Sequence, residues 1–299
     1  MKQLSRVQMA LLLGFLVVIW GVNWPLSKFA LAYTPPILFG GMRTFIGGLL
    51  LLAVALTRYK QLRLKESWKI YVISAVLNII LFYGLQMLGL GYLPAGLFSA
   101  IVFLQPVLLG IMAWLWLGEA MFGLKIAGFI IGFAGVAAIS AGGFTGDLSM
   151  TGVVLGFACA VSWAFGTFYV KKTSGQVDAV WLVTVQLLIG GVFMMGAGSL
   201  FESWSSIIWS APFIYDLLFI SIFVIAIGWF VFFRLVGSGE AGKVASFTFL
   251  IPLIAIFSSV LFMKEQITLN LVLGLLFIAA SIFMVNAKPK SMRMKQSAP

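Results

Sequence analysis

The sequence predicts an all-α integral membrane protein of ten transmembrane helices, arranged as two inverted five-helix repeats with both termini in the cytoplasm. The chain of 299 residues is 62% hydrophobic and only 9% charged, with a mean hydropathy of +1.13. Such a composition lies far outside the range of soluble domains. In addition, the chain holds ten apolar stretches long enough to cross a bilayer, and its second half repeats its first.

The apolar stretches are each close to the length of about twenty residues that a helix needs to cross the hydrocarbon core. Turn-forming pairs such as Pro35-Pro36 and Gly142-Gly143 separate them. The expected helices cover residues 8–32, 37–56, 70–90, 95–117, 124–141, 152–170, 179–200, 214–235, 245–263 and 269–285. No soluble domain fits between these helices.

The repeat is visible in landmark residues that recur at one constant separation: Trp20 with Trp163, Lys28 with Lys171, and Gly47-Gly48 with Gly190-Gly191. Each copy contains an odd number of crossings, so the second copy must begin on the opposite side of the membrane. We therefore expect a first repeat over residues 1–143, a second repeat over residues 144–287, and a basic cytoplasmic tail over residues 288–299. Inverted repeats of this kind are typical of alternating-access transporters.

The orientation follows from the positive charges, because Lys and Arg are retained on the cytoplasmic side of a membrane. Nearly all of the 19 Lys and Arg residues fall in loops on one side when the N-terminus is placed inside. The pattern predicts a multi-pass protein of the plasma membrane. We attribute the net charge of +11 to basic loops beside an anionic inner leaflet, and not to nucleic-acid binding.

The first helix carries a candidate binding face. Trp20, Asn23 and Trp24 lie on one side of it, and Trp163 holds the matching position in the sixth helix. A mid-span amide is expected to point into the protein, so this face predicts an aromatic cavity with hydrogen-bonding groups. Simple helix packing with interfacial tryptophans is the alternative, because aromatic residues make up 15% of the chain.

Further polar residues lie within predicted spans. Burying a polar side chain there costs free energy unless it has a hydrogen-bond partner or contacts water. Arg43, about seven residues into the second helix, has two interpretations: it contacts an anionic group of the substrate, or it binds backbone carbonyls. The remaining candidates for substrate contacts are uncharged amides, namely Asn78, Gln86, Gln105 and Gln186.

Two prolines occupy equivalent mid-helix positions, Pro106 in the fourth helix and Pro252 in the ninth. A proline removes a backbone hydrogen bond, and interrupted helices in inverted-repeat transporters often mark a binding site or a hinge. A simple kink tolerated by neighbouring helices is equally compatible with the sequence.

These features together resemble the drug/metabolite transporter superfamily, specifically its ten-helix EamA type. The resemblance rests on Trp20-Gly21, Lys28, Arg43, the run Tyr92-Leu93-Pro94-Ala95-Gly96, Pro106 and Gly118-Glu119. It implies export or exchange of small metabolites, amino acids among them, through a central cavity. Gln186 stands where the second repeat would match Arg43, so the substrate cannot be transferred from a relative.

The expected function is secondary transport of a small metabolite, an amino acid or a related amphipathic compound, by alternating access. The eight acids fall at or near predicted loops or helix ends and histidine is absent, so facilitated diffusion or exchange is the simplest expectation. Multidrug or cation efflux is the alternative. An integral membrane enzyme is less favoured, because the chain shows no catalytic triad or metal motif. We expect no cofactor; the expected partners are a small-molecule substrate and the lipid bilayer, with a homodimer as an open possibility.

Overall fold

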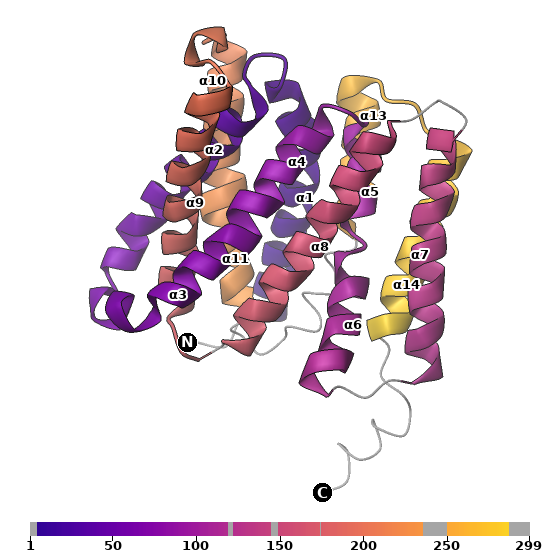
Figure 1. Ribbon diagram of the computed structural model, residues 1–299, viewed down its shortest axis with the longest axis horizontal. Helices are drawn as coiled ribbons and strands as arrows, with labels where there is room; N and C mark the ends of the chain where they lie inside the picture. The colour runs from indigo at the N-terminus through magenta and orange to yellow at the C-terminus, as the bar shows by residue number, and fades with distance from the viewer. Residues whose placement is uncertain (1–4, 119–121, 145–148, 174, 236–249, 287–299) are drawn as a thin grey trace, which may run out of the picture.

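The computed structural model describes residues 5–118, 122–144, 149–173, 175–235 and 250–286. Within these residues the chain is helical and contains no strand, which confirms the predicted all-α class (Figure 1). The helices are α1 (Arg6–Ala30), α2 (Pro36–Leu56), α3 (Leu64–Ala75), α4 (Phe82–Leu90), α5 (Ala95–Val102), α6 (Gln105–Leu117), α7 (Gly123–Phe144), α8 (Met150–Lys172), α9 (Ala179–Phe201), α10 (Ala211–Phe219), α11 (Gly228–Leu235), α13 (Leu250–Met263) and α14 (Leu269–Asn286).

Short non-α segments connect some of these helices. Two π-helical segments, η2 (Val76–Leu81) and η4 (Ile220–Ile227), join α3 to α4 and α10 to α11. The 3-10 turns η1 (Tyr59–Gln61) and η3 (Trp204–Ser206) lie between longer elements. Because η2 and η4 occur in the third and eighth spans, the two halves share an irregularity that the hydropathy pattern does not reveal.

Among the described residues, seven helical stretches are long and apolar enough to cross a membrane. Three shorter apolar helices, Gly123–Gly135, Leu250–Met263 and Leu269–Met284, accompany them. Together they fall on the ten apolar stretches expected from the sequence. The start of α1 and the end of α14 lie toward the same end of the bundle (Figure 1). Which end faces the cytoplasm remains a prediction from the positive charges.

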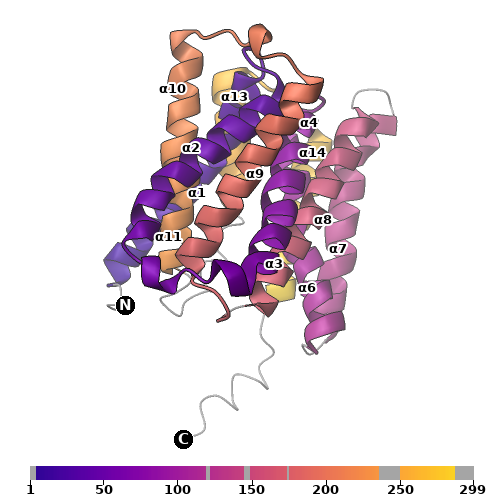
Figure 2. The same cartoon turned by 60° about the vertical axis from the view of Figure 1, so that its left-hand side comes forward.

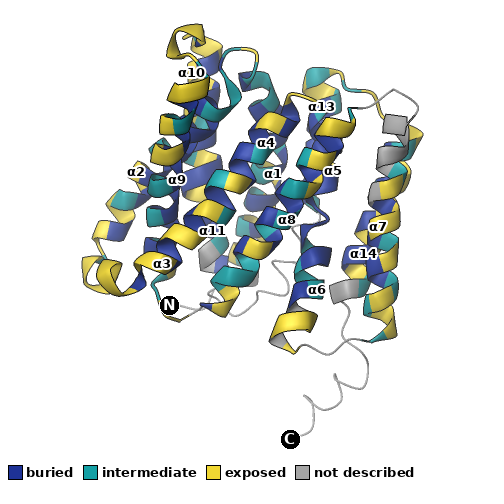
Figure 3. Cartoon of the chain, in the orientation of Figure 1, coloured by how far each residue is buried: buried dark blue, intermediate teal, exposed yellow. Residues whose placement is uncertain are grey.

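The helices of the two halves pack against each other in matching pairs. α2 runs along α9, and α7 runs along α14, so second and seventh spans meet, as do fifth and tenth (Figure 2). α1 packs on α13, while α8 packs on α5 and α6. The inner faces of these helices are buried and the outward faces are exposed (Figure 3). The core therefore lies between the halves, where a central cavity would have to be.

Glycines allow α2 and α9 to approach closely. A Cβ atom added to Gly191 of α9 would lie 2.7 Å from the backbone nitrogen of Phe45, closer than real Cβ atoms come. Small residues at helix contacts are a common means of association in membranes, since they bring backbones into van der Waals contact. The glycine pairs that mark the sequence repeat are thus packing positions.

Gly191→Ala is expected to lower the free energy of unfolding by about 1–3 kcal/mol, because the methyl group meets backbone that cannot move aside. Thermal unfolding of the purified protein in detergent measures this loss. Gly196→Ala on the same helix is the matched control, since nothing lies within 4 Å of its added Cβ. Equal melting temperatures for the two variants would show that the α2 and α9 backbones are not in close contact.

The fourth span is interrupted between α5 and α6. Phe103 leaves the helix with φ −74° and ψ 10°, and Leu104 follows before α6 begins at Gln105. Pro106 is the second residue of α6, where the missing N–H would have no helical partner in any case. A helix break therefore does occur beside Pro106. Pro252 is the third residue of α13 and is buried; the residues just before α13 lie outside the described part.

Candidate functional site

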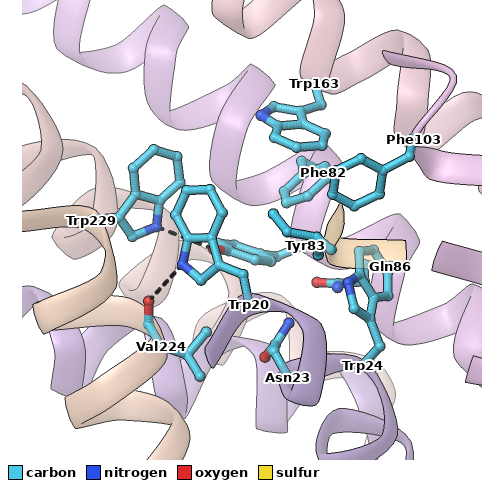
Figure 4. A pocket seen from close by; sticks show the side chains of 11 residues that line it. Trp20, Asn23, Trp24, Phe82, Tyr83, Gln86, Phe103, Trp163, Val224 and Trp229 are labelled. Carbon is cyan, nitrogen blue, oxygen red and sulfur yellow. Dashed lines mark hydrogen bonds between the residues drawn. The ribbon is translucent and has the colours of Figure 1, made fainter. Parts of the chain in front are cut away.

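A cavity lies between the two halves near the middle of the bundle. The lining side chains come from α1, α4, α8, α11, α13 and the segments η4 and 103–104: Trp20, Asn23, Trp24, Phe82, Tyr83, Gln86, Phe103, Trp163, Val224, Trp229 and Ile251 (Figure 4). About 40 Å³ of it is open to the centre of a water-sized sphere, which is room for a few waters. A larger molecule requires the walls to part.

Aromatic rings form most of the cavity wall, in two groups. Trp163 of α8 packs against Phe82 and Phe103, with ring centroids 5.2 Å and 5.6 Å away. On the other side Trp20 of α1 meets Trp229 of α11 edge to face at 5.4 Å. The faces of aromatic rings are apolar and carry the negative part of the ring quadrupole. They can therefore bind apolar groups, and ammonium groups through cation–π interactions.

Both indole N–H groups of the second group already have partners. Trp20 Nε1 donates to the Val224 carbonyl oxygen at 3.3 Å, and Trp229 Nε1 donates to the Tyr83 hydroxyl at 3.3 Å (Figure 4). These bonds cross between the halves, because α1 and α4 precede residue 143 while η4 and α11 follow it. They fix the orientations of the two rings.

Arg43 lies behind this wall rather than in it. Its side chain is fully buried, and its Nη1 donates to Ser27 Oγ at 2.7 Å and to Asn23 Oδ1 at 3.4 Å. Its Nη2 donates to Gln86 Oε1 at 2.8 Å, and its guanidinium carbon lies 4.6 Å from the centre of the Tyr83 ring. Arg43 therefore holds the cavity residues Asn23, Gln86 and Tyr83 in place with a single cation.

The three remaining amide candidates, Gln105, Asn78 and Gln186, contact neighbouring helices or are buried away from the cavity. Gln105 Nε2 donates to Thr167 Oγ1 at 3.3 Å and so links α6 to α8. The Asn78 amide lies against Gly166 of α8, whose added Cβ would collide with it. Gln186 is 2% exposed, and its Oε1 has no hydrogen-bond partner among the described residues. The structure does not bring these three side chains into the wall of the cavity.

Tyr83, Trp229 and Val224 belong to the cavity, although sequence reasoning did not select them. The reason is the π-helical geometry of η2 and η4, in which each turn takes up one more residue than in an α-helix. Asn78 lies within η2 and Gln86 lies in α4, and the two amides face different neighbours. The hydrogen bond between the Tyr83 hydroxyl and the Trp229 indole could not be predicted, because the sequence shows only that both residues are aromatic.

One acidic residue is buried, although it lies near the start of its helix as expected. Asp216 lies inside the eighth span and is only 6% exposed. It is the sixth residue of α10, which begins at Ala211, three residues before the expected start, and α1, α2 and η4 pack against this helix. Burial here comes from packing by other helices, which hydropathy does not encode.

The described fold and cavity define a class: a helical membrane protein with two matching halves around a central polar–aromatic site, as in secondary transporters. Residues 8–141 and 150–287 match the EamA-like transporter family, one match in each half. The chain belongs to this family. It is therefore a membrane transporter rather than an enzyme, and a multi-pass membrane protein, in accord with the plasma-membrane location expected above.

Several similar proteins cover nearly the whole chain. The "Uncharacterized transporter YvbV" of Bacillus subtilis is 64% identical over 293 residues, 98% of this chain and 96% of its own length. The "Probable amino-acid metabolite efflux pump" of Escherichia coli is 24% identical over 290 residues, 90% of this chain and 89% of its own. A solved crystal structure shares the fold with a TM-score of 0.68 at 17% identity, covering 98% of this chain and all of its own.

Proposed function

We propose that this transporter moves an amphipathic amino acid or a closely related metabolite, as an exporter or exchanger, by alternating access through the central cavity. The observation that carries the proposal is the chemistry of the cavity wall: aromatic faces with neutral amides and no charged side chain among its lining residues. A relative named as an amino-acid metabolite efflux pump agrees with this substrate class.

The wall suits a molecule that has an apolar part and an ammonium group. The rings of Trp20, Trp163 and Trp229 can receive the apolar part and stabilise the ammonium group through cation–π contacts. The Asn23 and Gln86 amides offer hydrogen bonds to a carboxylate or a polar side chain. Because all of these groups are neutral, a zwitterion can enter without leaving an unpaired protein charge behind.

The experiment is counterflow by the purified protein in liposomes preloaded with single unlabelled amino acids and supplied with the same labelled compounds outside. Saturable, compound-specific counterflow of amphipathic amino acids is the expected result. A lipophilic cation in the same panel tests the alternative, since aromatic faces also bind such cations. Counterflow of that cation alone would overturn the proposal in favour of multidrug efflux.

Alternating access also needs closures at the two ends of the cavity, and the end carrying Lys28 offers one. Glu265 accepts hydrogen bonds from the backbone nitrogens of Ala95 at 2.7 Å and Gly96 at 3.2 Å, at the start of α5. Lys28 Nζ lies 3.6 Å from Glu265 Oε1 and donates to the Leu93 carbonyl oxygen at 2.7 Å. These bonds join the second half to the first.

Glu265→Gln is expected to weaken this closure by about 1.5–3 kcal/mol, because hydrogen bonds to a charged acceptor are lost. The cavity then spends more time open at this end, which the charge pattern places outside. The measurement is the rate at which a membrane-impermeant maleimide labels Trp24→Cys in a Cys159→Ala background. Glu66→Gln, at an exposed position, is the control. Equal labelling rates would show that Glu265 does not keep this end closed.

A further inference from the structure

Asp216 is the buried acid that the cavity chemistry leaves unexplained. It lies in α10 within an apolar span, and neither Oδ1 nor Oδ2 has a hydrogen-bond partner among the described residues. A bare carboxylate in such surroundings is strongly unfavourable, so it needs a proton, a cation or a moving partner. Intramembrane acids of this kind are by default functional candidates.

Arg43 is the cation that interacts with it, yet the two do not form an ion pair. The helices that carry them are in contact, with the rings of Phe39 and Phe213 6.1 Å apart one turn before Arg43 and Asp216, but no Arg43 nitrogen lies within 4.0 Å of an Asp216 oxygen. Arg43 Nη1 and Nη2 are instead bound by neutral side chains, while its Nε is buried and has no hydrogen-bond partner within the described ranges. An unpaired donor and two unpaired acceptors thus lie near one another in the same buried region.

The remaining charged and titratable groups around α10 are few. α2 contributes Arg43, and η4 contains none. α1 contains Arg6, at the opposite end of the helix, and Lys28, whose amine is already held by Glu265 and Leu93. On α10 itself Tyr215 is 73% exposed and points away from the interior. Arg43 is therefore the group on these elements that can compensate an ionised Asp216.

We propose that Asp216 is a proton-binding site linked through Arg43 to the cavity. With Asp216 protonated, Arg43 remains on Ser27, Asn23 and Gln86, as in this structure. When the proton leaves, the carboxylate attracts Arg43, which then weakens its bonds to Asn23 and Gln86 in the cavity wall. Proton binding and substrate binding at these two places are consequently coupled, and coupling of this kind acts in both directions.

This inference deepens the proposed function, because it supplies the ion that drives net transport. It replaces the simpler expectation of facilitated diffusion, which rested on the apparent absence of a carboxylate inside the membrane. One proton is taken up at Asp216 on one side of the membrane and released on the other, so a proton gradient drives net movement of the substrate.

The first test uses the same liposomes, loaded with the amino acid that shows counterflow, under an imposed pH gradient or an imposed sodium gradient. We expect accumulation driven by the pH gradient in the wild type and its loss in Asp216→Asn, with counterflow retained. Glu66→Gln, an exposed acid, should accumulate as the wild type does. Accumulation by Asp216→Asn equal to wild type, or accumulation driven by sodium alone, would overturn the proposal. Loss of counterflow in the wild type would instead contradict the proposed function.

A second measurement depends neither on the folding of Asp216→Asn nor on the substrate. The aspartates of the chain are Asp147, Asp178 and Asp216, so protein labelled with carboxyl-¹³C aspartate reports on few groups. We expect the infrared band of a protonated carboxylic acid to shift on labelling, to persist in Asp147→Asn and Asp178→Asn, and to vanish at high pH. If no aspartate band of this kind is present at any pH, Asp216 does not bind a proton.

Discussion

Arg43→Gln is expected to lower the free energy of unfolding by about 3 kcal/mol and to abolish transport. The guanidinium makes three hydrogen bonds to buried side chains, each worth about 1.5–3 kcal/mol, offset in part by the relieved burial of a charge. Without it Asn23 and Gln86 lose the partner that orients them. Thermal unfolding in detergent, followed by counterflow in liposomes, measures both effects.

Arg63→Gln is the control for this experiment, since Arg63 is exposed near the end of the bundle. The comparison also decides between a direct contact with the substrate and a structural role for Arg43, whose bonds go to side-chain oxygens and not to the backbone carbonyls expected from the sequence. A variant that unfolds at the wild-type temperature but binds no substrate would assign Arg43 a direct contact with the ligand. Joint loss of stability and transport would assign it the positioning of Asn23 and Gln86.

Trp163→Ala is expected to raise the half-saturating substrate concentration about tenfold or more, because removal of a buried aromatic anchor costs about 2 kcal/mol of binding. Trp163 supplies the ring between Phe82 and Phe103, and the cavity loses one side without it. Concentration-dependent counterflow measures the change. Trp116→Ala, at a ring 56% exposed on the outer surface of α6, is the matched control. An unchanged half-saturating concentration in Trp163→Ala would place the substrate elsewhere.

The helices were predictable because a bilayer requires long apolar segments whose backbone groups are paired internally. α9, for instance, covers Ala179–Phe201, against an expected range of 179–200. The break beside Pro106 was also foreseeable, since proline carries its own backbone restriction wherever it occurs. Such properties are local, so a short window of sequence contains them.

The cavity was predictable only in part. Trp20, Asn23, Trp24, Gln86 and Trp163 reach its wall, and the first three do so because α1 stays α-helical through that region. Tyr83 and Trp229 were not anticipated, because the π-helical segments rotate the residues that follow them. A change of helical register depends on the packing of neighbouring helices, and single-sequence periodicity does not report it.

By itself the sequence determined the membrane class, the ten apolar segments, the internal repeat and the family resemblance, all of which follow from composition, spacing and local backbone rules. Tertiary structure alone decided that Arg43 binds Asn23, Ser27 and Gln86, and that Asp216 is buried nearby with no hydrogen-bond partner in the part of the chain that the structure describes. The physical reason is that the free energy of a buried charge depends on which groups distant segments bring to it.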